Sequence, residues 1–399
     1  MKQCLAIHGG RPVRERYLPY GKQSIDEEDI QAVINVLKSD FITTGPIISQ
    51  FEEQVAAYVG TKYAVAFSSG TAALHGACFA AEISDGDEVI TTPMTFAASA
   101  NSVLYQGGLP VFADIKSDTY NIDPRSVRDK ITSKTKAIIP VHFTGQPVEL
   151  DEIVKIAQEF NLIIIEDAAH ALGAMYKNKK IGSISDMTMF SFHPVKHITT
   201  GEGGIITTND EEYYQKLLQF RTHGITRDPN KLVENQGPWY YEMQFLGFNY
   251  RMTDIQAALG LSQLQKLDSF ISKRKQYAAI YQEELKELPE IILPKQLNDV
   301  DSSWHLYIIR LNLMLLKADR KEIFQALQKE NIGVNVHYIP VHTQPFYKQL
   351  GYKSGICPES ERLYEEIITL PLFSGMTEED ALDVIQAVKK VIKFYSVIK

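Results

Sequence analysis

Residues 190–204, FSFHPVKHITTGEGG, place a single lysine, Lys196, in a segment that follows a short apolar run. The run MTMFSF predicts a strand that ends near Ser191, five residues before the lysine. Pro194 lacks a backbone N–H and the three following glycines disfavour helix, so this segment is not the interior of a helix. We therefore expect Lys196 in a turn at the end of a strand, where it is a candidate for chemistry.

The same segment carries two histidines, His193 and His197, at the spacing of two metal ligands on one face of a helix. Because Pro194 and the neighbouring glycines and threonines argue against a regular helix, we expect no metal site here.

Short apolar runs alternate with amphipathic stretches from about residue 26 to residue 260. The strand-like runs are YAVAFS, DEVITT, LPVFAD, KAIIPVHF and NLIIIED. They show little polar alternation, which is typical of a mainly parallel sheet covered by helices on both faces. We predict an N-terminal arm and a large α/β domain over residues 1–260, followed by a smaller α+β domain over 261–399. In the second domain WHLYIIRL and GVNVHYIPVH are predicted strands.

Polar residues follow several of these predicted strands, at the sheet edge where open α/β sheets bind ligands. Asp167 and His170 follow NLIIIE, although Asp167 could instead cap a following helix. Gly70 and Thr71, in SSGTAAL, begin a predicted helix whose free N–H groups favour a phosphate, although an ordinary helix start explains them as well. Phe96 could stack on a flat ring or fill the core.

Together these features fit one ligand, a flat pyridine ring that carries a phosphate arm and an aldehyde. The phosphate would lie on Gly70, Thr71 and Ser191, the ring against Phe96, and its nitrogen against Asp167. The sequence contains neither a G-x-x-x-x-G-K-[ST] motif nor a strand-linked G-x-G-x-x-G motif, which argues against a P-loop enzyme or a dinucleotide-dependent dehydrogenase.

Nearly the whole chain resembles the DegT/DnrJ/EryC1/StrS family of sugar-nucleotide aminotransferases. The resemblance rests on the following segments: FITTGPIISQFEE, SSGTAAL, TTPMTFAASANSV, PVHFTGQP, IIEDAAHALGA, FSFHPVKHITTGEGG, RTHG, NYRMTDIQAALGLSQL and VHYIPVHTQPFY. It implies the aspartate-aminotransferase fold, fold type I, and pyridoxal 5′-phosphate (PLP) as the cofactor. Gln23 and Ser68 depart from the family pattern, which often has proline and asparagine at these positions.

The resemblance also implies roles for individual residues. Lys196 matches the lysine that binds PLP covalently, Asp167 the partner of the pyridine nitrogen, and His170 the residue near the 3-oxygen of the ring. The remaining matches are Gly70, Thr71 and Ser191 at the phosphate, Phe96 at the ring, Asn249 at the phosphate of a neighbouring subunit, and Tyr20, Asp40, Thr43, His337 and Tyr338 at the nucleotide sugar. A homodimer with shared active sites follows. Arg251 could receive the carboxylate of the amino donor or form a structural salt bridge.

The implied activity is transfer of the amino group of glutamate to C4 of a UDP-linked 4-keto-6-deoxy-N-acetylhexosamine, by a ping-pong mechanism, in the synthesis of pseudaminic acid-type sugars. A different 4-keto nucleotide sugar is the first alternative. Sugar 3-dehydratases with this fold have histidine where this chain has Lys196. A regulatory protein that binds PLP without turnover is a further alternative from another functional class.

Composition and charge are compatible with this assignment. The chain has 399 residues, a formal net charge of −8 and three widely separated cysteines. The negative charge argues against binding to nucleic acid or anionic membranes, and an odd number of dispersed cysteines is typical of reduced thiols in a cytosol. No uncharged apolar run reaches the ~20 residues that a membrane-spanning helix needs. We therefore expect a cytoplasmic protein.

Overall fold

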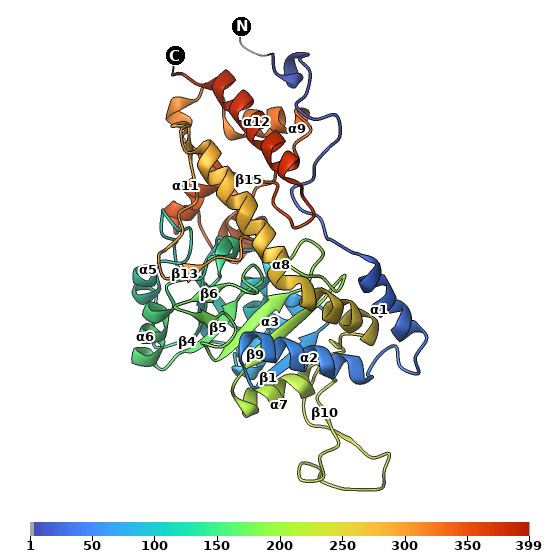
Figure 1. Cartoon of the computed structure of the whole chain (residues 1–399). Helices are drawn as coiled ribbons and strands as arrows, with labels where there is room; N and C mark the ends of the chain where they lie inside the picture. Colours follow the sequence, from blue (N-terminus) through green and yellow to red (C-terminus); the bar gives the residue numbers. More distant parts are fainter. Residues whose placement is uncertain (1–3, 399) are drawn as a thin grey trace.

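A seven-stranded sheet forms the centre of the computed structural model, which describes residues 4–398 (Figure 1). Its order is β1-β9-β8-β5-β4-β2-β3. The strands are β1 (Tyr63–Phe67), β2 (Glu88–Thr91), β3 (Leu109–Phe112), β4 (Thr135–Ile139), β5 (Ile163–Asp167), β8 (Met187–Ser191) and β9 (Gly204–Thr208). The five strands from β3 to β8 in this order pair in parallel, whereas β9 is antiparallel to both of its neighbours. The predicted α/β class and mainly parallel sheet are confirmed.

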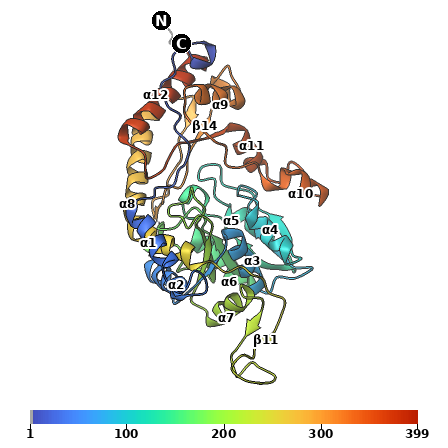
Figure 2. The same cartoon turned by 90° about the vertical axis from the view of Figure 1, so that its right-hand side faces the viewer.

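Helices cover both faces of this sheet, as Figures 1 and 2 show. They are α2 (Pro46–Val59), α3 (Gly70–Ala80), α4 (Ala98–Tyr105), α5 (Pro124–Asp129), α6 (Leu150–Phe160) and α7 (Glu211–Phe220). Successive side chains of one strand enter different cores, since they point to opposite faces. Ile164 packs in the cluster that contains Phe51 of α2, and Ile165 in the cluster that contains Leu74 of α3. Burial on both faces explains why these strands lack polar alternation.

The long helix α8 (Asp254–Leu285) connects the sheet to a second hydrophobic cluster. Its N-terminus carries a capping box between Thr253 and Gln256, and α1 (Glu27–Leu37) packs along it. Leu267 belongs to the core of the central sheet, whereas Tyr281 belongs to the second cluster. The predicted domain boundary at residue 260 falls inside this helix and remains a proposal.

A three-stranded sheet with flanking helices forms most of the second part, where both termini lie in Figure 1. The sheet contains β12 (Ile291–Ile292), β14 (Tyr307–Leu311) and β15 (Ile367–Leu370), and its flanking helices are α9 (Arg320–Lys329), α10 (Pro345–Gln349), α11 (Pro358–Glu366) and α12 (Glu378–Tyr395). Leu5 and Leu18 also pack in its core. The N-terminal segment therefore packs against the second part before the chain enters the first.

The remaining elements are short. They are the strands β6 (Met175–Tyr176), β7 (Lys179–Lys180), β10 (Ile225–Thr226), β11 (Glu242–Met243) and β13 (Val300–Asp301), and the 3₁₀ helices η1 (Ala6–His8), η2 (Phe143–Gly145), η3 (Leu313–Leu315) and η4 (Val341–Thr343). The segment between β10 and β11 projects from the body of the molecule as a long loop (Figures 1 and 2). Within residues 4–398, none of the helices has the length and apolar character needed to cross a bilayer.

One predicted strand, GVNVHYIPVH, is not a strand in the structure. The segment, residues 333–342, forms only the isolated bridge from Asn335 to Thr369, and Ile332 just before it bridges to Leu18. The place beside β14 is taken by β15, so this segment runs along the far edge of β15. Its side chains also contact β15, as His337 Nδ1 does with Thr369 Oγ1 at 2.9 Å.

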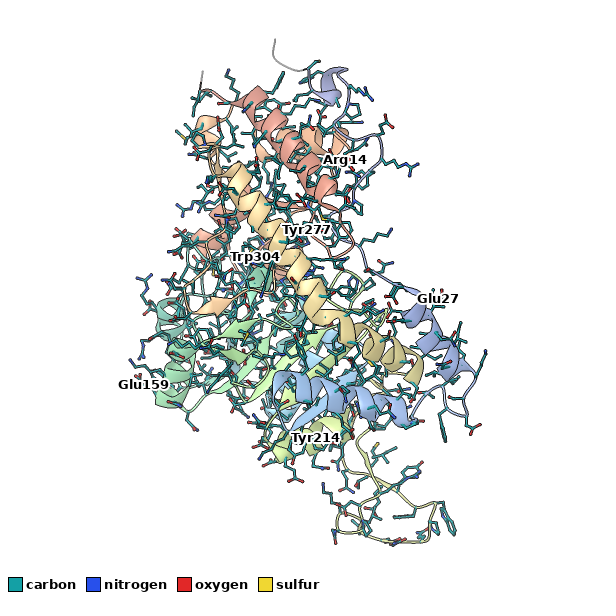
Figure 3. All side chains as sticks on the ribbon, in the orientation of Figure 1. Arg14, Glu27, Glu159, Tyr214, Tyr277 and Trp304 are labelled. Atoms are coloured by element: carbon teal, nitrogen blue, oxygen red, sulfur yellow. The ribbon has the colours of Figure 1, made fainter. Side chains whose placement is uncertain are left out.

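Arg274 of α8 is buried at the junction of the two parts, one helical turn before Tyr277, which is labelled with Trp304 in Figure 3. Its Nη1 donates to the carbonyl oxygens of His305 at 3.1 Å and Leu372 at 2.7 Å. Burial lowers the pKa of Arg274 to about 10. Since unpaired buried carbonyls are costly, this arginine holds two segments of the second part against α8.

We predict that Arg274→Met lowers the free energy of unfolding by about 2–4 kcal/mol, because buried carbonyl oxygens lose their donor. Chemical denaturation monitored by circular dichroism measures the change. Lys273→Met, at the exposed neighbouring position, is the matched control and is expected to stay within about 0.5 kcal/mol of the unmodified protein. Equal stabilities of the two variants would contradict this role.

Candidate active site

Asp167 ends β5 and lies opposite Met189 of β8. Its carboxylate accepts hydrogen bonds from Ser99 Oγ at 2.5 Å and from the Ala169 N–H at 3.1 Å. Burial raises the pKa of Asp167, while the Ser99 hydroxyl, the Ala169 N–H and the charge of Lys196 oppose that rise. The carboxylate is therefore a buried acid whose charge depends on a small number of donors.

Turns rather than a helix follow Asp167, up to β6 at Met175. Its side chain bonds the N–H two residues ahead, as in an Asx turn. The helix-capping alternative for Asp167 is therefore wrong.

Lys196 lies in the turn after β8, as its sequence context predicts. Its N–H donates to the His193 carbonyl at 2.9 Å. Burial lowers the pKa of the Lys196 amine to about 8, with the charge of Asp167 opposing this effect. An amine with this pKa is partly neutral near physiological pH and can act as a nucleophile or exchange protons.

His170 is buried beside Tyr338, with 3.0 Å between His170 Nε2 and the tyrosine hydroxyl. Its ring lies 4.4 Å, centroid to centroid, from that of His305, and its Nδ1 is buried with no hydrogen-bond partner among the described residues. Burial and the charge of Lys196 hold the pKa of His170 well below its ordinary value. We conclude that His170 is neutral and keeps one polar atom available.

Gly70, Thr71 and Ser191 lie together where the turn after β1 meets the end of β8. Ser69 caps α3 by accepting from the Ala72 N–H at 3.1 Å, which leaves other N–H groups of the first turn free. A Cβ on Gly70 would lie 3.2 Å from Ser191 Cβ, and one on Gly204 would lie 2.6 Å from Gly70 Cα. The missing side chain at Gly70, the hydroxyl groups of Thr71 and Ser191, and the free N–H groups at the N-terminus of a helix together fit a phosphate group.

Phe96 is 63% exposed, so the alternative in which it fills the core is wrong. Its ring lies 6.4 Å from that of Tyr338. The same segment supplies Thr95 and Ser99, whose hydroxyl oxygens are 2.8 Å apart. An exposed aromatic ring beside the donor to Asp167 suits a flat ligand held between them.

Tyr20, His337 and Tyr338 form a continuous aromatic surface next to these residues. Ring centroids are 5.3 Å apart for Tyr20 and His337, and 4.8 Å apart for His337 and Tyr338. A Cβ on Gly21 would lie 3.5 Å from Val195, which places the segment of Tyr20 beside that of Lys196. The structure therefore brings three of the five expected sugar-binding residues to the candidate site.

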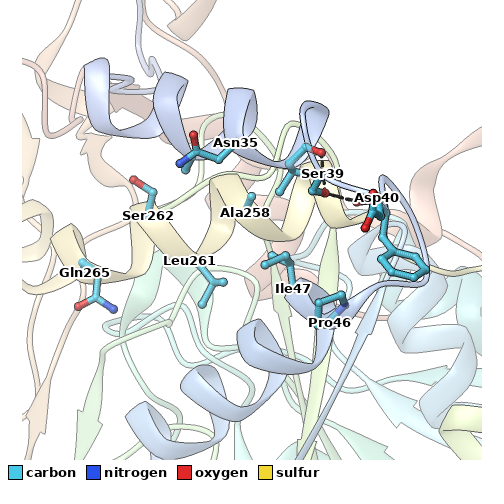
Figure 4. Close-up of a pocket in the computed structure, with 12 residues that line it drawn as sticks. Asn35, Ser39, Asp40, Pro46, Ile47, Ala258, Leu261, Ser262 and Gln265 are labelled. Atoms are coloured by element: carbon cyan, nitrogen blue, oxygen red, sulfur yellow. Dashed lines mark hydrogen bonds between the residues drawn. The ribbon is translucent and has the colours of Figure 1, made fainter.

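Asp40 and Thr43 lie in a different environment. No hydrogen bond or ion pair within residues 4–398 joins either of them to Lys196, Asp167 or His170. Thr43 pairs with Thr253 at the start of α8. Asp40 lines a surface groove of about 590 Å³ between α1, α2 and α8, shown in Figure 4 together with Ala258 and Leu261.

Asn249 and Arg251 follow the long loop. Asn249 is exposed and forms a bridge with Thr222. The intervening Tyr250 accepts the Ser68 N–H at 2.7 Å, so this segment borders the turn that carries Gly70. Arg251 forms no salt bridge within the described part of the chain, which disfavours the structural alternative for it.

Three residues next to the site were not predicted from the sequence. Ser99 and Thr95 occur inside the segment TTPMTFAAS, at the i, i+4 spacing of one helical face, which is the signal that could have indicated them. His305 comes from the second part, and its ring packs against that of His170 at an interplanar angle of 39°. No local pattern in the sequence connects these two histidines.

The two histidines that flank Lys196 point to different surroundings. His197 is buried and its Nε2 donates to the Ser303 carbonyl at 3.1 Å, whereas His193 is exposed. Over residues 4–398 there is no group of three or more side chains arranged to hold a metal ion.

Comparison with known proteins identifies the family of this chain. The model of the DegT/DnrJ/EryC1/StrS aminotransferase family matches residues 23–389. SpsC of Bacillus subtilis, a spore coat polysaccharide biosynthesis protein, is 43% identical over 382 residues, which cover 95% of this chain and 98% of SpsC.

Two solved structures are similar over almost their whole length. PseC of Helicobacter pylori, an aminotransferase involved in the biosynthesis of pseudoaminic acid, gives a TM-score of 0.89 at 34% identity and covers 95% of this chain and 100% of its own. The PLP form of Spr1654 from Streptococcus pneumoniae gives 0.88 at 34% identity, covering 95% and 99%.

We predict that Ser99→Ala raises the pKa of Asp167, because the ionised carboxylate loses its strongest donor. If the ionised form is required, the acid limb of the pH profile of kcat/KM moves to higher pH and kcat/KM falls about tenfold. Ser102→Ala, whose hydroxyl bonds the Ser99 carbonyl at 3.0 Å, is the control. An unchanged acid limb in Ser99→Ala would refute this coupling.

We also predict that Lys196 of the cofactor-free protein reacts with a small amine-directed reagent with a midpoint near pH 8. The neutral amine is the reactive form, so the rate rises as the pH increases through that value. Peptide mass spectrometry over a pH series gives the midpoint. A midpoint near ~10.4, the ordinary value for lysine, would contradict the prediction.

Proposed function

Because this chain belongs to the DegT/DnrJ/EryC1/StrS aminotransferase family, we propose that it makes UDP-4-amino-4,6-dideoxy-N-acetyl-β-L-altrosamine. The chain is a PLP-dependent sugar aminotransferase of fold type I. The proposed acceptor is UDP-2-acetamido-2,6-dideoxy-β-L-arabino-hex-4-ulose, and the proposed donor is glutamate. Similarity to PseC over the whole chain supports this acceptor and a role in pseudaminic acid-type sugar synthesis.

The residues present fit the cofactor. Lys196 would bind it covalently, Gly70, Thr71 and Ser191 would hold its phosphate, Phe96 would cover its ring, and Asp167 and His170 would contact its ring nitrogen and 3-oxygen. When bound, PLP supplies an electron-withdrawing ring that stabilises negative charge at the α-carbon of the amino donor.

In this proposal Lys196 moves protons. Its amine has a pKa of about 8, so it can both accept and release a proton near neutral pH. It would take the α-proton of glutamate in the first half-reaction and deliver a proton to C4 of the sugar in the second. The two substrates then use the same site in turn, and ping-pong kinetics follow.

The single observation on which the proposal most depends is the buried carboxylate of Asp167 at the end of β5, where the charge of Lys196 opposes the rise in its pKa that burial causes. Its negative charge would favour the protonated pyridine nitrogen and so keep the ring electron-withdrawing. The hydrogen bond from Ser99 Oγ opposes the rise in the pKa of Asp167 that burial causes.

The acceptor would lie against Tyr20, His337 and Tyr338, the aromatic surface beside Lys196. Asp40 and Thr43 would reach it from the segment after α1. We further propose a cytoplasmic homodimer in which the exposed Asn249 reaches the phosphate of the partner's cofactor.

A second acceptor is suggested by sequence identity. The chain is 43% identical to SpsC, a spore coat polysaccharide biosynthesis protein, and 34% identical to PseC. Because the identity to SpsC is higher, the alternative substrate is a 4-keto nucleotide sugar that is used to build a surface polysaccharide. A PLP-binding protein without turnover is the remaining alternative.

We predict amino transfer from glutamate to a UDP-linked 4-keto-6-deoxy-N-acetylhexosamine in a panel of UDP-, GDP- and dTDP-linked 4-keto sugars. Formation of 2-oxoglutarate and of the amino sugar, followed by mass spectrometry, measures turnover. A higher rate with a dTDP- or GDP-linked sugar would show that the proposed UDP-linked acceptor is wrong. If glutamate alone yields no 2-oxoglutarate, the result would support the alternative that the protein binds PLP but has no catalytic activity.

We predict that Lys196→Ala lowers turnover at least ~10³-fold, since the proton carrier is lost. Borohydride reduction of the unmodified enzyme should attach the cofactor to the peptide that contains residue 196. Lys134→Ala, at an exposed position, should keep full activity. An active Lys196→Ala enzyme, or cofactor attached to another lysine, would exclude the assigned role.

A further inference from the structure

Arg274 is a buried cation without an anionic partner. Its side chain is 2% exposed, and no salt bridge joins it to an acid anywhere in residues 4–398. Its Nε is buried and has no hydrogen-bond partner among the described residues. A neutral donor could satisfy the carbonyl oxygens that Arg274 contacts without the cost of burying a charge. The structural role of this residue therefore does not account for its charge.

The guanidinium of Arg274 lies next to the turn that carries Lys196. Arg274 Nη1 donates to the carbonyl oxygen of His305 at 3.1 Å. His197, the residue after Lys196, donates through Nε2 to the carbonyl oxygen of Ser303 at 3.1 Å. The two side chains thus bind the backbone of the same short segment, two residues apart, and this segment separates them by little more than its own length.

This shared segment is itself held by two turns of the first part. Ser303 N–H donates to the Gly145 carbonyl at 3.1 Å, and Leu306 N–H donates to the Thr144 carbonyl at 3.2 Å. Gly145 has a φ of +101°, and a Cβ there would lie 2.7 Å from the His170 carbonyl oxygen. Only glycine allows this approach. The distance between the guanidinium and the lysine is therefore set by the folded backbone.

Two opposite charges act on the Lys196 amine. Burial is the main reason why the pKa of this amine is low; the carboxylate of Asp167 raises it, and the guanidinium of Arg274 lowers it. The other titratable side chains around the amine are neutral near pH 7, because burial lowers the pKa of each imidazole and raises that of the phenol. They are His170, His197, His305, His337 and Tyr338.

The acid that serves the ring nitrogen creates a conflict for the lysine. Asp167 favours the protonated form of any nearby base, which includes Lys196 as well as a pyridine nitrogen. A protonated amine cannot accept the α-proton of an amino donor. A second charge of opposite sign, placed on the other side of the amine, removes this conflict.

We propose that Arg274 acts on the reaction through Lys196, because its uncompensated charge favours the neutral form of that amine against the effect of Asp167. Arg274 is a positioning residue in this role, since its guanidinium is too buried to contact a substrate. The inference rests on the proposed function for the task of Lys196 as a proton carrier, whereas the charge effect itself exists in the cofactor-free protein.

The pH at which Lys196 of the cofactor-free protein is half reactive toward an amine-directed reagent tests the charge separately from the hydrogen bonds. R274Q keeps an amide donor but removes the charge, so this midpoint should rise by about one pH unit and the neutral fraction at pH 7 should fall about tenfold. R274K keeps a cation with fewer donors, and its midpoint should match that of the unmodified protein. K273Q removes an exposed charge at the preceding position and is the control.

A pH titration of the visible absorption band of the PLP-loaded protein is the second readout. Its midpoint should also move to higher pH in R274Q and stay unchanged in R274K, because a nearby cation disfavours protonation of the nitrogen at position 196. Circular dichroism identifies the variants that fold, and R274M is the second neutral variant.

An unchanged midpoint in a folded neutral variant would overturn the proposal. Equal rises in R274Q and R274K would also overturn it, because the lost hydrogen bonds and not the lost charge would then be the cause. Neither measurement requires turnover of a sugar, so a failed sugar panel would reject the proposed function and leave this test intact.

Discussion

The register of β5 against β8 is the constraint on which the site depends. Asp167, the last residue of β5, lies opposite Met189, and β8 continues only to Ser191 before the turn that carries Lys196. Asp167 N–H donates to the Pro140 carbonyl at 2.9 Å, and the Ala168 N–H donates to the Met189 carbonyl at 2.9 Å. Hydrogen bonds to both neighbouring strands thus fix the backbone from which the Asp167 carboxylate projects.

Glu166, the residue before Asp167, is also held by hydrogen bonds. It points to the opposite face, where its carboxylate lies 2.6 Å from His142 Nε2 and accepts from Thr188 Oγ1 at 3.0 Å. His142 Nδ1 accepts the Val148 N–H at 3.1 Å, so Nε2 carries the proton and donates it to Glu166. The two adjacent acids therefore point to opposite faces of the sheet. Glu166 joins a buried polar network, and Asp167 faces the candidate site.

Much of the first part was predictable because the information is local. The apolar runs predicted β1 to β5 and β8 correctly. Lys196, Asp167, Gly70 and Phe96 all lie at the ends of strands or in the segments that follow them. β9 and β15 were not predicted, nor was the irregular path of GVNVHYIPVH, since pairing between distant segments decides them. Ser99 and His305 escaped prediction for the same reason, because their partners lie 68 and 135 positions away, at Asp167 and His170. Asp40 and Thr43 were placed by resemblance; Asp40 lines the groove beside α8, and Thr43 bridges to Thr253 at the start of that helix.

The central claim is that the charge of Asp167 holds the cofactor ring protonated beside Lys196. Nitrogen NMR of the enzyme loaded with PLP labelled with ¹⁵N in the ring measures this directly. The account predicts the chemical shift of a protonated pyridine nitrogen at neutral pH, and that of an unprotonated one in Asp167→Asn. An identical shift in both proteins would contradict it.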